Sequence, residues 1–227
     1  MGKLIVITGP DGSGKKMQAE LLVKRLKEGN YGAETIDFPQ YKKNLFGKMV
    51  GRYLAGEFGD PIKLNPYISS ILYAGDRLES MGQIRQWLDD EKIVVCDRYT
   101  GDNFLHQGSK IVNLLDRGKF FDWLEELEFG VFGARRADIV FYLDVSLDVS
   151  LRLLKNKDAQ DKKSYTSGKK DGHENEEHLM AVRKINEELI QRHEWVKINC
   201  MKDGEIIPPE EIHKIIWENL NSKVILF

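Results

Sequence analysis

The chain has 227 residues, 41% hydrophobic and 31% charged, and this length and composition suit a single globular domain with a full core. A formal net charge of −2 excludes an overall field that would attract nucleic acid or acidic membranes. No apolar run approaches membrane-spanning length. The two isolated cysteines, Cys96 and Cys200, fit a reducing compartment better than a disulfide scaffold, so we expect a cytoplasmic protein.

The first predicted element is a short apolar strand, Leu4–Thr8, that runs directly into a glycine-rich loop. The spacing Gly9-x4-Gly14-Lys15 matches the phosphate-binding P-loop pattern G-x-x-x-x-G-K-[ST] at every position but the last. At that position Lys16 replaces the Ser or Thr whose hydroxyl binds Mg²⁺. The sequence therefore predicts a site for nucleotide phosphates with one irregular residue.

The chemistry of this loop is specific to anions. Gly9, Gly12 and Gly14 let successive backbone N–H groups converge on one point. Apolar residues repeat at helical spacing from 15 to 28, and the N-terminus of that predicted helix adds positive potential there. Lys15 adds a mobile positive charge for the β- and γ-phosphates. A chance glycine-rich turn is the alternative, and the flanking strand and helix argue against it.

Strands and amphipathic helices alternate along the rest of the chain. Several strands are almost wholly apolar, as in a parallel sheet that helices cover on both faces. We therefore predict one α/β domain over residues 1–227, a doubly wound five-stranded parallel sheet of the P-loop NTPase type. The predicted strands are 4–8, 34–38, 93–97, 139–144 and 196–200, and the predicted helices lie near 15–28, 66–91, 115–130, 147–156, 176–194 and 209–221.

Aromatic residues near the second strand could form the wall of a base pocket. Pro39 forces an extended exit from that strand, and Phe38 before it fits either the core or a pocket. Tyr73 and Arg77 lie four residues apart and share one helix face, which suits stacking on a nucleobase and hydrogen bonding to it. A core tyrosine with an exposed arginine is the alternative interpretation.

The third predicted strand ends in two charged residues. Asp97, at a strand end beside a P-loop, can hold Mg²⁺ through water, and Arg98 can bind a phosphate with two hydrogen bonds. An Asp-Arg surface turn would give the same letters. Downstream, Asn103, His106 and Gln107 fall at helical spacing, and the two amides could contact a base edge.

Residues 155–178 are rich in Lys, Asp, Ser, Gly and Glu and have almost no apolar residues. Composition alone is equally typical of a disordered surface loop and of a mobile lid whose lysines close over phosphates. The segment follows the fourth strand, on the side where a doubly wound sheet binds ligands, and this position favours a lid inserted into the domain.

Taken together, these residues resemble the thymidylate kinase family, whose members phosphorylate dTMP to dTDP with ATP. The resemblance rests on the loop Gly9–Lys15, Phe38-Pro39, Tyr73-x-x-x-Arg77, Asp97-Arg98-Tyr99, His106-Gln107-Gly108 and the strand 139–144. It covers most of the chain in family order. It implies a transferase of nucleotide biosynthesis that supplies dTDP for dTTP, with Mg²⁺ as cofactor, ATP and dTMP as substrates, and a two-fold homodimer.

The resemblance also implies roles for individual residues. Lys15, Arg98 and Asp11 would be catalytic, and Asp97 and Asp11 would hold Mg²⁺. ATP would be bound by Gly9, Pro10, Asp11, Gly12, Ser13, Gly14, Lys15, Lys16 and Arg152. dTMP would be bound by Asp11 at the sugar, Arg98 at the phosphate, Phe38 and Pro39 beside the sugar, and Tyr73, Arg77, Asn103 and Gln107 at the thymine.

Three departures from the family pattern leave other functions open. Lys16 removes the metal-binding hydroxyl, His106 stands where the family usually has Tyr, and the lid carries lysines rather than a clear catalytic arginine. The alternatives are a kinase for another nucleotide or nucleoside, and a nucleotide-binding sensor that has a degenerate P-loop and no turnover.

Overall fold

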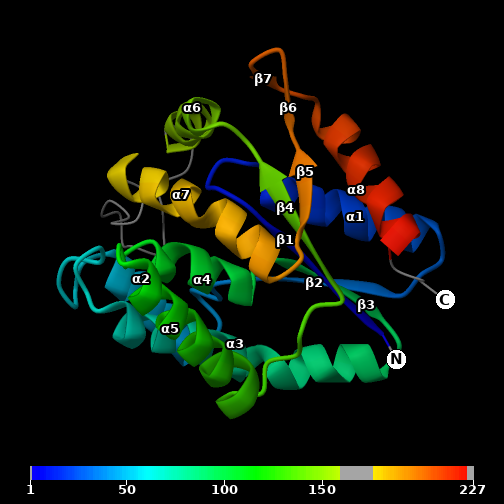
Figure 1. The fold of residues 1–227 in the computed structure, drawn as a ribbon. Coiled ribbons are helices and arrows are strands. Elements are labelled where there is room, and N and C mark those ends of the chain that lie inside the picture. The colour runs from blue at the N-terminus through cyan, green and yellow to red at the C-terminus, as the bar shows by residue number, and fades with distance from the viewer. Residues whose placement is uncertain (1, 159–175, 224–227) are drawn as a thin grey trace.

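The structure is a computed structural model that describes residues 2–158 and 176–223 (Figure 1). Most of the predicted lid, residues 159–175, lies outside the described residues.

A five-stranded parallel sheet with the order β2-β3-β1-β4-β5 forms the centre of the molecule. The inner strands are almost wholly buried, because helices cover both faces and exclude polar side chains. This confirms the predicted fold class, and the strand ends agree with the predicted ones to within one residue. The strands are β1 (Lys3–Thr8), β2 (Ala33–Asp37), β3 (Ile93–Asp97), β4 (Ile139–Asp144) and β5 (Val196–Asn199).

Helices pack on both faces of this sheet, as Figure 1 shows. One face is covered by α1 (Lys15–Glu28) and α8 (Pro209–Lys223), whose apolar residues share a core with the sheet. The other face carries α3 (Pro66–Asp89), α4 (Thr100–Gly108), α5 (Leu114–Glu125) and α7 (Glu176–Arg192). The helix α6 (Leu147–Asp158) follows β4. These helices match the predicted ones, with the exception of α4. For that segment the sequence analysis noted only that Asn103, His106 and Gln107 fall at helical spacing.

Several elements differ from the prediction. Helix α2 (Leu45–Leu54) was not predicted; its two glycines lower its helix propensity, although its apolar residues follow a helical period. Its start is fixed by Asn44, whose Oδ1 accepts a hydrogen bond from the Gly47 N–H at 2.6 Å. The helix predicted over 115–130 changes after α5 into a π-helix, η1 (Glu126–Val131). A small antiparallel hairpin, β6 (Met201–Lys202) and β7 (Glu205–Ile206), follows β5.

The strand order places the glycine-rich loop beside the end of β3. Strand β1 lies between β3 and β4, and Ile7 pairs with Asp97. The carboxyl ends of parallel strands meet at one edge, and ligands bind where the strand order reverses. The loop after β1 and the residues Asp97 and Arg98 therefore lie together at this edge.

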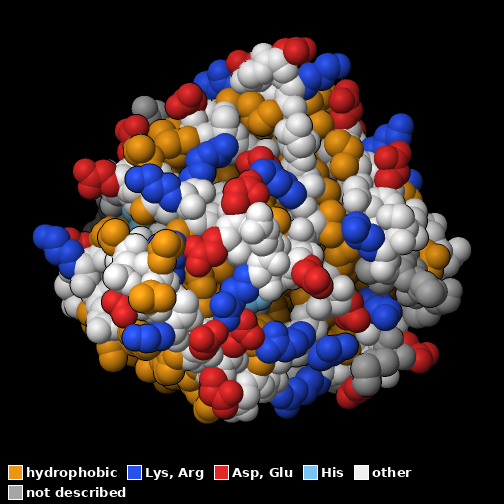
Figure 2. Space-filling view, in the orientation of Figure 1, with side chains coloured by type: hydrophobic (Ala, Val, Ile, Leu, Met, Phe, Trp, Pro, Cys, Tyr) orange, Lys and Arg blue, Asp and Glu red, His pale blue; other side chains and the backbone are white. Residues whose placement is uncertain are grey.

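The described part of the chain contains no helix that is long and apolar enough to span a membrane. Cys96 and Cys200 form no disulfide, as the sequence predicted, and both are fully buried. On the face shown in Figure 2, acidic and basic side chains are interspersed, in keeping with the small net charge.

Candidate active site

The loop between β1 and α1 has the backbone of a phosphate-binding turn. Gly9 and Gly12 have φ angles of 145° and 83°, which side chains other than hydrogen rarely tolerate. A Cβ on either glycine would also lie 2.8 Å from a backbone oxygen. Gly14 caps α1 and has no side chain to bind the first amides of the helix. These amides are therefore available to an anion.

Lys15 is almost completely buried within its own loop. Its Nζ donates hydrogen bonds to the carbonyl oxygens of Gly9 and Pro10, both at 2.8 Å, and lies 3.4 Å from Asp11 Oδ1. Burial and the neighbouring Arg98 charge lower the pKa of the Lys15 ammonium, against the effect of Asp11. A bound phosphate would replace the loop carbonyl oxygens and the Asp11 carboxylate as the partner of this cation.

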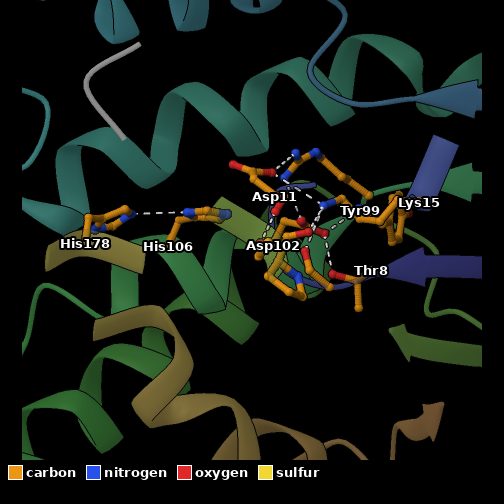
Figure 3. Close-up of polar contacts among 11 residues, drawn as sticks. Thr8, Asp11, Lys15, Tyr99, Asp102, His106 and His178 are labelled. Carbon is orange, nitrogen blue, oxygen red and sulfur yellow. Dashed lines mark hydrogen bonds and ion pairs between the residues drawn. The ribbon is translucent and has the colours of Figure 1, made fainter. Parts of the chain in front are cut away.

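Asp11, Arg98 and Asp102 form a charged network beside the loop (Figure 3). The Arg98 guanidinium contacts the Asp11 carboxylate and donates to Asp102 Oδ1 at 3.1 Å. Thr8 Oγ1 donates to the other Asp102 oxygen at 2.8 Å. Burial alone would raise the pKa of Asp11, but the Arg98 and Lys15 charges outweigh it and hold that pKa well below its ordinary value.

The Arg98 backbone is itself unusual. Its φ of 65° lies in the left-handed region that non-glycine residues rarely adopt, and its N–H donates to the Ile7 carbonyl oxygen at 3.0 Å. Such strain concentrates at functional sites, where the surrounding structure holds it. The carboxylates of Asp11 and Asp102 hold the guanidinium in one place, and some of its N–H donors are left for a ligand.

Asp97 has the properties of a ligand for a hard cation. Burial raises the pKa of its carboxyl, and Asp97 Oδ1 is buried without a hydrogen-bond partner among the described residues. The described residues contain no cluster of three His, Cys, Asp or Glu that could hold a metal. Mg²⁺ is commonly held by one or two carboxylates together with substrate phosphates, so Asp97 fits this ion. Asp11 fits less well, because Arg98 and Lys15 already contact it.

Two residues predicted to bind ATP lie apart from this network. The Lys16 side chain is 77% exposed, and its Nζ lies 3.9 Å from Glu20 on the same helix. Arg152, on α6, forms an exposed ion pair with Glu205 of the β6–β7 hairpin. The other predicted ATP-binding residues belong to the loop itself.

A cavity adjoins the network, and every residue predicted to bind dTMP lies in its wall. It lies between the loop, the end of β2 and the helices α3 and α4. The predicted residues that line it are Asp11, Phe38, Pro39, Tyr73, Arg77, Arg98, Asn103 and Gln107. Tyr41, Leu54, Tyr99, Asp102 and His106 complete its wall.

Arg77 is not exposed, and it is paired inside the protein. Its Nε donates to Glu128 Oε2 at 3.0 Å, and a second N–H contacts Oε1 of the same carboxylate. Asn103 Nδ2 donates to Glu128 Oε1 at 2.9 Å and to the Ser70 carbonyl oxygen at 3.2 Å. Glu128, from η1, thereby holds both side chains at the cavity wall. No sequence signal singles out this carboxylate, because a run of acidic residues such as 125–128 is typical of a solvent-exposed helix face.

The part of the cavity that Asn103 and Gln107 line has polar atoms without partners among the described residues. Ser69 Oγ donates to Gln107 Oε1 at 2.6 Å, which leaves Gln107 Nε2 buried and unpaired among the described residues. Asn103 Oδ1 is buried and unpaired in the same sense. An unpaired buried donor and acceptor are costly unless a ligand satisfies them. Both side chains line the cavity, so a ligand with a polar ring edge fits this end.

The loop, the strand-end Asp97 and Arg98, and the adjoining cavity define a P-loop nucleotide kinase. The family model described as thymidylate kinase matches residues 7–212. The chain belongs to the thymidylate kinase family, and it transfers the γ-phosphoryl group of ATP to dTMP, giving dTDP and ADP.

Individual relatives agree with this assignment. A probable thymidylate kinase of Methanococcus aeolicus is 30% identical over 232 aligned positions, which cover 100% of both chains. A thymidylate kinase of Thermomicrobium roseum is 32% identical over 153 positions, 66% of this chain and 67% of the relative. The solved structure of the Candida albicans thymidylate kinase shares the fold, with a TM-score of 0.72 and 19% identity over 97% of this chain and 92% of that one. None of these comparisons supports a different acceptor or a sensor.

Proposed function

We propose that dTMP binds in the cavity with its thymine at the Asn103 and Gln107 end and its phosphate at Arg98. The observation that carries this placement is the pair of unpaired buried atoms, Asn103 Oδ1 and Gln107 Nε2. Arg77 adjoins them and offers N–H donors to the carbonyl groups of the base. Tyr73 supplies an aromatic face, and Phe38 an apolar wall for the sugar.

Phosphoryl transfer depends on positioning and on neutralising charge. Arg98, held by Asp11 and Asp102, is a cation fixed in place before the acceptor phosphate arrives. Lys15 would exchange its contacts with the loop carbonyls for the phosphates of ATP, which the loop amides bind. Asp97 would hold Mg²⁺, which when bound neutralises phosphate charge.

Three further proposals concern the adenine of ATP, the oligomeric state and the compartment, and each has one supporting observation. Arg152 would adjoin the adenine, and its ion pair with Glu205 would orient it. A homodimer is supported by exposed apolar side chains on the neighbouring helices α2 and α3, namely Leu45, Ile68 and Leu78. Two free, buried thiols support a cytoplasmic location.

The test of the proposed chemistry is ADP release from ATP and Mg²⁺ with dTMP, dUMP, dCMP, dGMP, dAMP and thymidine offered separately. We expect fast turnover with dTMP, and a Lys15→Ala variant with kcat lower by roughly 10²-fold or more and nearly unchanged dTMP affinity. Lys24→Ala, an exposed lysine on the same helix, is the matched control. Retained activity in Lys15→Ala would contradict the role of the loop.

A further inference from the structure

Two histidines from different helices meet at the edge of the acceptor cavity. His106, on α4, lines the cavity, and its Nδ1 lies 3.2 Å from Nε2 of His178, in the first turn of α7. The ring centroids are 5.4 Å apart and the ring planes lie 28° from parallel, so the two rings meet edge to edge through these nitrogens. Figure 3 shows the two imidazoles pointing toward one another. This contact joins the cavity wall to a helix that is 72 residues away in the chain.

The hydrogen bond constrains the protons of both rings. One of the two nitrogens must carry the hydrogen and the other must offer its lone pair, so the contact couples the tautomers of the two neutral rings: both carry their proton on Nδ1, or both carry it on Nε2. Two charged rings would set two N–H donors against each other. Burial lowers the pKa of His106 to about 3 and that of His178 to about 4, so both rings are neutral near pH 7.

The charged groups that face the pair have both signs. Asp11, Arg98 and Lys15 act on His106, and Lys110 and Asp11 act on His178. The first three belong to the network that the proposed function assigns to the substrate phosphates. The His106 ring therefore interacts with the charged groups on the side of the cavity where the acceptor would lie.

We propose that His178 is a positioning residue for the acceptor: its Nε2 fixes the ring plane and tautomer of His106 at the cavity wall and so couples the first turn of α7 to acceptor binding. This inference rests on the proposed placement of dTMP. It assigns no chemical step to His178, which acts through His106. By reciprocity, an occupied cavity also stabilises the start of α7.

Two substitutions separate the hydrogen bond from the ring contact. His178→Phe keeps an aromatic ring at this position but removes Nε2, whereas His178→Gln keeps an amide near the Nε2 position and removes the ring. We expect His178→Phe to raise the KM for dTMP roughly 2- to 10-fold, as the loss of one hydrogen bond implies, with kcat and the KM for ATP within about two-fold of wild type. His178→Gln should restore most of the dTMP affinity. His213→Gln, on α8 at the opposite face of the sheet, is the control.

A second readout does not depend on catalysis. Nitrogen NMR of the histidine side chains at pH 7 should show one dominant tautomer for His106 in the wild-type protein and a mixture in His178→Phe. An unchanged His106 tautomer in that variant, or an unchanged KM for dTMP, would overturn the inference. Absence of dTMP turnover in the wild-type protein would instead refute the proposed function, and the NMR comparison would still test the histidine pair.

Discussion

At the scale of single residues, the buried ion pair of Arg77 and Glu128 would make the proposed base recognition and the stability of the fold depend on the same atoms. Only 3% and 0% of these side chains are exposed. Removing one partner of a buried pair leaves an uncompensated charge, at a cost of about 3–5 kcal/mol. We therefore expect Arg77→Ala to lower both the free energy of unfolding, measured with urea, and the preference for dTMP over dCMP.

The double variant Arg77→Ala, Glu128→Gln distinguishes these effects. The neutral amide removes the unpaired charge and can still contact Asn103, so most of the stability should return. The preference for dTMP should stay low, because the donors for the thymine carbonyls are still absent. If the double variant discriminates dTMP from dCMP as the wild type does, Arg77 has no part in base recognition.

The sequence predicted which residues line the acceptor cavity but not what holds them. Residues such as Asp11, Arg98 and Asn103 could be proposed as site residues because the sequence resembles a known family at their positions. Glu128 and Asp102 could not, because an acidic side chain without a motif around it most often faces solvent. Their function depends on contacts between distant segments, which a local pattern does not contain.

At the scale of elements, the packing of α2 on α3 depends on Gly75. A Cβ at Gly75 would lie 2.5 Å from the Phe46 ring of α2, whereas one at Gly82, on the same helix, meets nothing within 4 Å. Both substitutions to Ala gain a similar helix propensity, up to about 1 kcal/mol. Gly75→Ala also forces the two helices apart, so it should be less stable than Gly82→Ala by about 1–3 kcal/mol. Thermal and urea unfolding of both variants measure this difference, and equal stabilities would show that Phe46 moves aside freely.

The strands could be predicted from their apolar runs, but the helices that the sequence revealed are not the most amphipathic ones. The apolar strands and the long helices were found almost to the residue, because their burial on the sheet imposes the pattern. Helix α2 was not predicted, because its glycines lower helix propensity. The change to a π-helix in η1 was not predicted either, because its composition is that of an ordinary helix.

At the scale of the whole molecule, buried neutral histidines make the fold sensitive to mild acid. Burial lowers the pKa of His106 to about 3 and that of His178 to about 4. In the unfolded chain both histidines bind a proton near pH 6.5, whereas in the folded chain they stay neutral at that pH. Stability is then full above pH 6.5 and falls with pH, by up to about 1.4 kcal/mol per pH unit for each histidine. Asp76 and Asp97, whose pKa values are raised by burial, act in the opposite direction, because the folded chain binds their protons more readily than the unfolded chain as the pH falls. Urea unfolding between pH 7 and pH 5 should therefore show a decline of roughly 4 kcal/mol from the pair. The double variant His106→Gln, His178→Gln should lose much less over the same interval, and a flat wild-type curve would mean that the two rings are as accessible to protons when folded as when unfolded.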